Sequence, residues 1–413
     1  MNYYYIFIIS AIIIEFIFAR TTGYLNIKSL SPELPEEFKN SYDESKYNKS
    51  QRYTRTNEKF DVVTGTFDFI FILCIIVFGL FNVLDLFIRS FGFQSDMVNG
   101  LLFLGLFMII QDIFSTPFSL YRHFVIEERF GFNKMSIKTF VTDKIKGICL
   151  MTLIGTPLMG ILLYFFESFG DIAWLYAWAI VSGFILILQP LFTTFIAPLF
   201  NTFTPLEEGE LKDSINSYSE KVQFPISRID IMDGSKRSSH SNAYFSGIGK
   251  RKRIALFDTL MEKQSANEIL AIVAHEVGHY KKKHIQKGIV LSILTSGFMF
   301  FLVSVFMENP ELFAAFSMEN LSVYGSLIFF QILFSPINII LSLFTNALSR
   351  KNEFEADKYS AKTTGDSLHL ISGLKKLTIE NLGNLTPHPL NVFLNYSHPP
   401  VLQRIRALSR YVS

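Results

Sequence analysis

The sequence predicts a predominantly α-helical, polytopic membrane protein with about seven transmembrane helices and one α+β insertion. The 413 residues are 49% hydrophobic and only 18% charged. Together with a mean hydropathy of +0.31, this composition excludes a disordered chain and argues against an ordinary cytosolic enzyme. Long apolar runs recur along the chain, and basic residues gather in alternate loops. Because the net charge is only +2, we expect no nucleic-acid partner.

The apolar runs are the first elements to place, because each is about the length that crosses a bilayer as a helix. They cover residues 3–18, 66–88, 97–114, 148–166, 174–198, 289–307 and 321–348. The first run has neither a basic n-region nor a small-residue cleavage site, so we expect a retained span rather than a signal peptide. We predict an N-terminal membrane domain, 1–198, with five spans. The second domain, 199–413, then holds a polar insertion, two further spans and C-terminal helices.

The loops between the spans alternate in charge, and this alternation predicts the topology. Nearly all Lys and Arg lie in segments 20–63, 118–145, 199–288 and 349–413. By the positive-inside rule, the N-terminus is expected outside and the C-terminus in the cytoplasm. The membrane would be the endoplasmic reticulum in a eukaryote and the inner (cell) membrane in a bacterium.

Some polar residues lie within the apolar runs. Asp68, Asp85 and Asp112 are expected to face the bundle interior or a water-filled cavity, and hydrogen bonding between helices is an equally good interpretation. Cys74 and Cys149 both lie in apolar stretches, so we predict neither a disulfide framework nor a cysteine metal site.

The insertion, 199–288, changes its periodicity along its length. Runs at 228–232 and 253–257 are rich in β-branched or aromatic residues and predict strands, and 242–245 is a third candidate. A helix is expected from Ser265 onward. Ser265 and Glu268 have the spacing of a capping box, and an apolar stripe follows.

That helix carries an H-E-x-x-H sequence at His275, Glu276 and His279. Residues four apart lie on one helix face, so both imidazoles can reach one zinc ion while Glu276 lies beside a bound water. A metzincin would place a third histidine ten residues after the first, but Ile285 stands there. His284 misses that position by one, and we expect it to be solvated after the basic run 281–283.

A third ligand is expected after the last span, where Glu353 and Asp357 are four residues apart. One carboxylate could bind the metal while the other orients a ligating histidine. Acidic pairs at this spacing also occur on solvated helix faces, which is the interpretation that we adopt for Glu355.

Together these motifs make the sequence similar to the type I CaaX prenyl proteases, which are integral-membrane zinc metalloproteases. The resemblance extends over nearly the whole chain. It is carried by H-E-x-x-H, by E-x-x-x-D, and by segments 124–134, 196–201, 236–245, 253–260 and 396–404. It implies seven helices around a water-filled chamber, with a gluzincin-like α+β catalytic insertion on the cytoplasmic side.

Residue by residue, the resemblance implies that His275, His279 and Glu353 bind one zinc ion per chain. Glu276 would be the general base, and Asp357 would hold a ligating histidine. His398 and Arg404 would lie near the metal, where they could stabilise the oxyanion or hold the C-terminal side of the substrate. A different interpretation makes Pro399 and Pro400 a helix start, with Arg404 on its exposed side.

Substrate binding is expected at Asn242, Ala243, Tyr244 and Phe245, an edge strand that could pair with an extended peptide. His240 could assist there, or be an ordinary surface histidine. The predicted activity is cleavage near the C-terminus of prenylated CaaX proteins, after the modified cysteine. One alternative is a prenyl-independent protease that removes misfolded membrane proteins. A distant alternative is a metal transporter, which would have no need for the glutamate of H-E-x-x-H.

Overall fold

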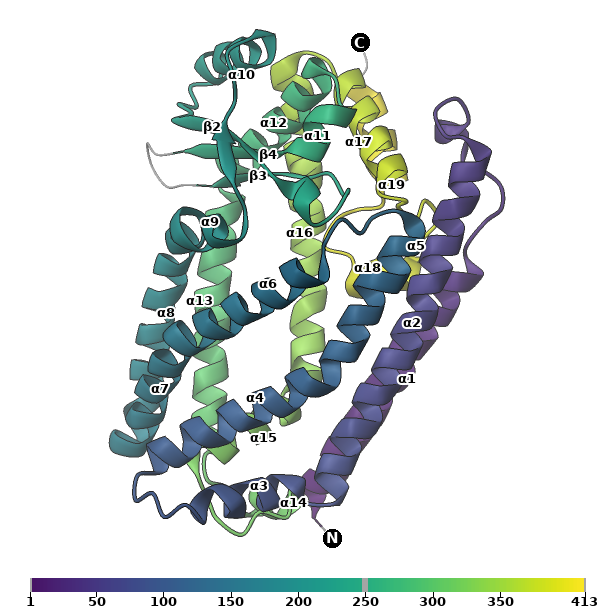
Figure 1. The fold of residues 1–413 in the computed structure, drawn as a ribbon. Helices are drawn as coiled ribbons and strands as arrows, with labels where there is room; N and C mark the ends of the chain where they lie inside the picture. Colours follow the sequence, from purple (N-terminus) through teal and green to yellow (C-terminus); the bar gives the residue numbers. More distant parts are fainter. Residues whose placement is uncertain (1, 247–251, 412–413) are drawn as a thin grey trace.

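The computed structural model describes residues 2–246 and 252–411, and it is predominantly helical (Figure 1). Within this described part, six helices are long and apolar enough to cross a membrane, and a bent helix pair brings the number to seven. These elements are α1 (Tyr3–Lys28), α2 (Glu44–Val77), α4 to α5 (Asp96–Phe130), α6 to α7 (Ile137–Ser168), a 3-10 turn with most of α8 (Gly170–Leu188 together), α13 (His284–Phe306), and the pair α15 (Val323–Leu333) and α16 (Ser335–Thr364). The predicted polytopic α-helical fold is confirmed.

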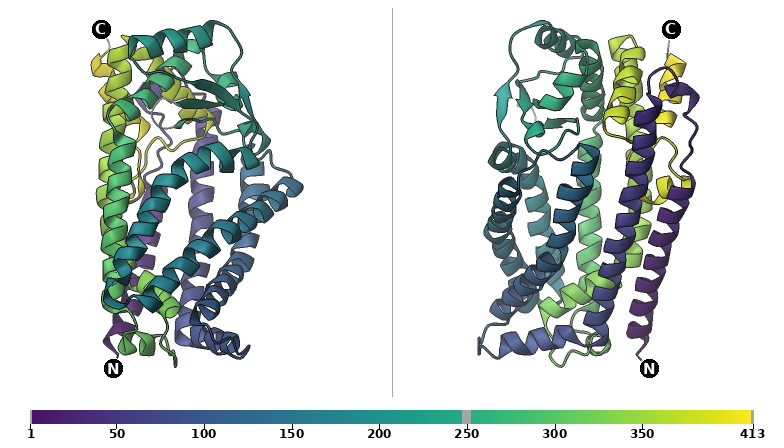
Figure 2. Two further views of the ribbon diagram at one scale, coloured as in Figure 1. Left: turned by 90° about the vertical axis from the view of Figure 1, so that its left-hand side faces the viewer. Right: turned by 45° about the vertical axis from the view of Figure 1, so that its right-hand side comes forward.

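The membrane helices stand around a common axis, and this arrangement is consistent with the predicted chamber. Helices α1 and α2 run side by side along one flank, and α7 (Thr156–Ser168), α8 (Ala173–Leu191) and α13 form the opposite flank. Helices α4 (Asp96–Tyr121) and α6 (Ile137–Leu150) cross between the flanks at a slant (Figure 1). Figure 2 shows that the strands lie at the same end as the C-terminus, and the N-terminus lies at the other.

The predicted span 66–88 is wrong as a single helix. Helix α2 ends at Val77, and a separate helix, α3 (Leu80–Arg89), begins after Gly79. Gly79 has a left-handed backbone conformation, with φ of 61°. Glycine adopts this conformation without the steric cost that a Cβ atom brings, and it is the usual residue at such a helix end. Helix α3 lies across the end of the bundle (Figure 1).

For Asp85 the structure favours bonding between helices over a place on the wall of the chamber. Asp85 is fully buried and forms an ion pair with Arg89 at 3.0 Å, and it also accepts a hydrogen bond from Tyr324. Asp112 is paired with Lys144 at 3.0 Å. Bonding between helices, here from Tyr324 on α15, therefore explains Asp85. Asp112 is 47% exposed, and its ion pair with Lys144 agrees with both interpretations.

The run 321–348 also differs from a straight span, because α15 and α16 meet at an angle of 57°. Pro336 lies in the first turn of α16, where its missing N–H costs nothing. Helix α16 then continues to Thr364, so it extends beyond the apolar run and carries Glu353 and Asp357.

The soluble end contains one four-stranded sheet in the order β1-β2-β4-β3. The strands are β1 (Phe203–Pro205), β2 (Arg228–Met232), β3 (Ala243–Ser246) and β4 (Arg253–Phe257). Strands β2 and β4 are parallel, and the other two pairs are antiparallel. Two predicted strands are confirmed at their predicted bounds, and the third begins one residue later than expected. Strand β3 lies at an edge of the sheet.

Helices cover this sheet and form one apolar core with it. They are α10 (Glu210–Lys221), α11 (Asp258–Lys263), α12 (Ala266–Lys281), α17 (Leu368–Glu380) and α19 (Val401–Leu408). Helix α18 (Pro389–Asn395) packs instead against α16 and α1. The apolar stripe of α12 supplies Ile269, Val273 and Val277 to the core. The predicted capping box is confirmed, since the side chain of Ser265 accepts from the N–H of Glu268 and Glu268 bonds back to the N–H of Ser265.

Two of the sequence segments that carry the family resemblance, 124–134 and 236–245, meet in the fold. The ring of His240 stacks on Phe132 with centroids 4.0 Å apart, and its Nε2 lies 3.5 Å from a carboxylate oxygen of Glu127. The N–H of Ser239 donates to the carbonyl of Phe132 at 3.0 Å. These contacts fix the segment that leads into β3 against the membrane helices. Of the two interpretations of His240, the structural one is favoured.

Candidate metal centre

The metal centre is built where α12 packs on α16. A Cβ atom at Gly278 would lie 3.1 Å from Cα of Ala356, so a larger residue here would push the two helices apart by a few tenths of an ångström. The hydroxyl of Ser360 on α16 also donates to the carbonyl of Ala271 on α12 at 2.8 Å. The two helices are therefore held at a separation that lets side chains from both reach one point.

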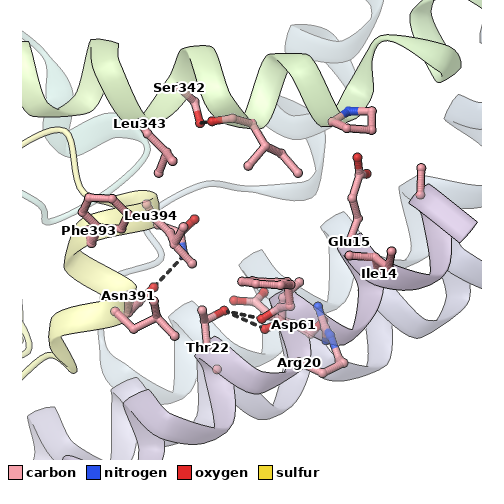
Figure 3. Close-up of a pocket in the computed structure, with 18 of the residues that line it drawn as sticks. Ile14, Glu15, Arg20, Thr22, Asp61, Ser342, Leu343, Asn391, Phe393 and Leu394 are labelled. Atoms are coloured by element: carbon pink, nitrogen blue, oxygen red, sulfur yellow. Dashed lines mark hydrogen bonds between the residues drawn. The ribbon is translucent and has the colours of Figure 1, made fainter.

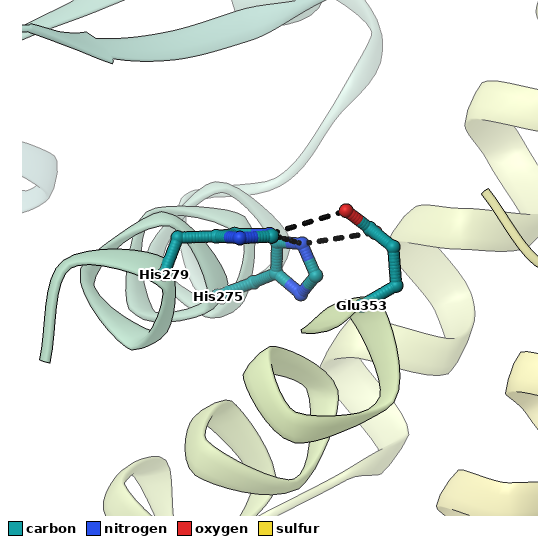
Figure 4. Close-up of side chains that lie close together, drawn as sticks. All are labelled: His275, His279 and Glu353. Atoms are coloured by element: carbon teal, nitrogen blue, oxygen red, sulfur yellow. Dashed lines mark hydrogen bonds and ion pairs between the residues drawn. The ribbon is translucent and has the colours of Figure 1, made fainter. Parts of the chain in front are cut away.

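His275, His279 and Glu353 meet at that point, with one ligand atom from each within 4.8 Å of the others (Figure 4). The two Nε2 atoms are 3.1 Å apart. The carboxylate of Glu353 lies 3.4 Å from Nε2 of His275 and 3.2 Å from Nε2 of His279. Two imidazoles and one carboxylate fit a metal such as zinc and leave a fourth position open for water or substrate.

Asp357 and Arg404 contact the candidate ligands and each other. Asp357 lies 2.9 Å from Nδ1 of His275, and Arg404 donates to both of its carboxylate oxygens at 2.8 and 2.6 Å. Arg404 also lies 3.3 Å from Glu353. Because both Asp357 and Arg404 are buried, the guanidinium balances the carboxylates away from solvent.

The charges around His275 hold a proton on the metal-free ring. Burial works against a charged imidazole, but hydrogen bonds to Asp357 and Glu353 outweigh it and raise the pKa of His275 to about 9. A metal ion needs the neutral ring, so the proton must leave on binding.

We therefore expect metal binding at pH 7.5 to release about one proton from His275, because that pH lies below its pKa of about 9. Isothermal titration of the metal-free protein in buffers of different ionisation heat measures this number. In Asp357→Asn the release should fall, because the neutral amide supports the imidazolium less. Equal release from the wild type and Asp357→Asn would contradict this account.

Glu276 and the open side of the cluster face a cavity of about 370 Å³. The histidines, Glu353 and His398 contribute to its wall, and so do Asn242 and Ala243 from the beginning of β3. Burial raises the pKa of the Glu276 carboxyl. The carboxyl of Glu276, whose proton affinity is raised, therefore lines the same cavity as the candidate metal ligands and the edge of the sheet.

Of the remaining predicted site residues, His398 lies in the cavity wall, whereas Tyr244 is not among the described residues that line it. His398 is largely exposed, and its Nε2 lies 3.4 Å from Glu353. The hydroxyl of Tyr244 reaches back across the sheet toward the sulfur of Met232, at 4.0 Å. Phe245 is the third residue of β3, with its Cα paired with Ile254.

One sequence-based interpretation at the site is wrong. His284 was expected to be solvated, but it is buried, and its Nδ1 lies 3.1 Å from Nδ1 of His279. Glu355 was expected on a solvated face, and its side chain is 34% exposed, but its carboxylate also lies 3.2 Å from Nε2 of His284. The cause is a tight turn at Lys283, whose φ is 58° and which ends α12 and starts α13. Helical spacing alone could not reveal a contact across this turn.

A larger cavity, of about 880 Å³, lies between α1, α2, α16 and α18 (Figure 3). Its walls are mainly apolar, with Glu15, Arg20, Glu58 and Asp61 as charged members. None of the described residues that line it belongs to the predicted site. Size alone therefore does not locate the chemistry, and the smaller cavity with its convergent titratable groups is the better candidate.

The fold and the site together define a polytopic membrane metallopeptidase. Residues 23–202 match the family model described as CAAX prenyl protease N-terminal, five membrane helices, and residues 205–412 match the model of peptidase family M48. The chain belongs to peptidase family M48. The predicted membership and the predicted class of enzyme, a membrane metallopeptidase, are confirmed.

Similar proteins cover almost the whole chain. CAAX prenyl protease 1 homolog of Mus musculus is 35% identical, over 92% of this chain and 90% of the mouse protein. CAAX prenyl protease 1 of Saccharomyces cerevisiae is 35% identical, over 97% of this chain and 94% of the yeast protein. The crystal structure of S. mikatae Ste24p superposes with a TM-score of 0.92 at 33% identity and covers 99% of both chains.

Proposed function

We propose that this chain is a zinc endopeptidase that cleaves prenylated CaaX proteins near their C-terminus, after the modified cysteine. The observation that carries the proposal is the meeting of His275, His279 and Glu353 beside Glu276 in a membrane protein of this family. The substrate class rests on the names of the mouse and yeast relatives. The proposed stoichiometry is one zinc ion per chain, supported by the single set of three candidate ligands among the described residues.

The proposed chemistry divides between the metal and the protein. Zinc held by His275, His279 and Glu353 would acidify a water molecule and polarise the scissile carbonyl. Glu276 accepts a proton from the attacking water and passes it to the leaving nitrogen, and burial raises the pKa of its carboxyl, which makes it a better proton acceptor than a solvated carboxylate. We assign His398, which lines the cavity with its Nε2 3.4 Å from Glu353, to donation of a hydrogen bond to the developing oxyanion.

Arg404 has a different part in this proposal. It is bound to Asp357 and to the ligand Glu353, and it also contributes to the wall of the cavity. We assign it to charge balance and to the orientation of Asp357, and thereby of His275, rather than to direct contact with the oxyanion.

The peptide is proposed to bind extended along the edge of the sheet. Asn242 and Ala243 line the cavity, and β3 has β4 on one side only among the described strands. The free side of β3 can add a further strand through main-chain hydrogen bonds. Tyr244 and Phe245 would continue this contact.

The division into 1–198 and 199–413 and the orientation in the membrane are also proposals. The matched ranges 23–202 and 205–412 support the division. The basic loops support a cytoplasmic C-terminus and an outer N-terminus. The membrane is then the endoplasmic reticulum in a eukaryotic cell and the inner membrane in a bacterial one.

The test of the substrate uses matched CaaX peptides with and without a farnesyl group on the cysteine. We expect the detergent-purified protein to cleave the farnesylated peptide with a kcat/KM at least about tenfold higher, because binding of the lipid contributes to transition-state stabilisation. Glu276→Gln protein serves as the control for contaminating proteases. Equal cleavage of both peptides would overturn the CaaX assignment in favour of a prenyl-independent protease.

A further inference from the structure

Each ligating histidine has a second ring nitrogen, and the structure pairs both of them. Nδ1 of His275 lies 2.9 Å from the carboxylate of Asp357. Nδ1 of His279 lies 3.1 Å from Nδ1 of His284, and Nε2 of His284 lies 3.2 Å from the carboxylate of Glu355. The second histidine therefore also connects to a carboxylate, but through one additional imidazole.

Only one arrangement of protons on neutral rings satisfies all these contacts. Nε2 of His279 faces Glu353 and the other ligand, so its proton must be on Nδ1 when a metal is bound. This N–H then donates to Nδ1 of His284, which carries its own proton on Nε2 and donates to Glu355. The two rings lie at 78° with centroids 5.1 Å apart.

The burial of His284 indicates that the hydrogen bonds from His279 through His284 to Glu355 are more than a surface contact. Its side chain is only 4% exposed, whereas that of Glu355 is 34% exposed. A buried imidazole that lost its partners would carry an unsatisfied polar atom, which costs about 1–3 kcal/mol. The left-handed residue Lys283 turns the chain so that His284 points back at His279.

We propose that His284 and Glu355 are positioning residues that fix the tautomer and the ring orientation of His279 for zinc. This inference rests on the proposed function, because it needs zinc at the three ligands. Outer partners of this kind raise the basicity of a ligating ring, and their loss typically weakens metal binding by about 10- to 100-fold. Neither His284 nor Glu355 is among the described residues that line the cavity. We therefore expect any effect of these residues on cleavage to act through the metal.

The test measures the zinc dissociation constant by competition with a chelator, together with the melting temperature of the metal-free protein. His284→Leu keeps the approximate volume and removes both ring nitrogens, and we expect zinc binding to weaken about 10- to 100-fold. His284→Gln keeps one acceptor and one donor and should recover a large part of this loss. Glu355→Gln, at a partly exposed position that tolerates substitution, should weaken binding to an intermediate degree.

His369→Leu is the matched control, because His369 is partly exposed and contacts only Asp366 among the ion pairs of the described residues. The inference is overturned if His284→Leu binds zinc as tightly as the wild type, or if His284→Gln loses as much affinity as His284→Leu. It is also overturned if both variants lower only the melting temperature of the metal-free protein, which is the result of a purely structural contact. Absence of zinc from the wild type would instead overturn the proposed function.

If His284→Leu does not fold, Glu355→Gln decides alone. Zinc affinity that matches the wild type in Glu355→Gln would then contradict the inference. Weakened affinity with an unchanged melting temperature of the metal-free protein would support it.

Discussion

Replacement of Glu276 by Gln is expected to abolish peptide cleavage and to leave zinc bound. Glu276 is not among the three ligands and lies in the cavity wall beside them. Glutamine has nearly the same shape but cannot take a proton from water, so kcat/KM should fall by a factor of about 10² to 10⁴. Zinc content by metal analysis and cleavage of a farnesylated peptide, measured on the same preparation, check this prediction.

Glu262→Gln is the matched control, because Glu262 is exposed on the neighbouring helix α11. It should keep both zinc and cleavage. Cleavage by Glu276→Gln within tenfold of the wild type would contradict the role of the general base. Flux of a metal ion across vesicles that survives in Glu276→Gln, without cleavage by the wild type, would favour the transporter.

The membrane fold could be predicted from sequence because long apolar runs and charged loops are local features. The prediction failed where a single residue changes the backbone direction, as at Gly79, since hydropathy does not distinguish one helix of 23 residues from two shorter ones. The bend before Pro336 was missed for the same reason. In both places the apolar run continues through the break.

The site was predictable to the extent that helical spacing encodes it. The four-residue spacing predicts that two side chains share a helix face, and this holds for His275 with His279 on α12 and for Glu353 with Asp357 on α16. The contact between the two helices is tertiary, and only the family resemblance implied it. The contact of His284 with His279 spans five residues and a left-handed turn. No helical periodicity predicts such a contact, so the sequence favoured a solvated histidine.

Replacement of Glu353 by Ala is expected to have the second large effect, on zinc itself. The substitution removes one of three ligands and one of the two carboxylates that face His275 and Arg404. We expect zinc binding to weaken by more than about 100-fold, beyond the effect of any outer partner, and cleavage to be lost with the metal. The zinc dissociation constant and the zinc content after dialysis measure this.

The fold should survive this change, which separates loss of a ligand from unfolding. The packing of α12 on α16 depends on Gly278 and Ser360, and Arg404 keeps its bidentate contact with Asp357. Circular dichroism and the elution volume in detergent should therefore match the wild type. Glu353→Ala should also cost more zinc affinity than Glu355→Gln on the same helix. The reverse order would mean that Glu355, and not Glu353, supplies the carboxylate on which the metal depends, and the ligand assignment would have to be abandoned.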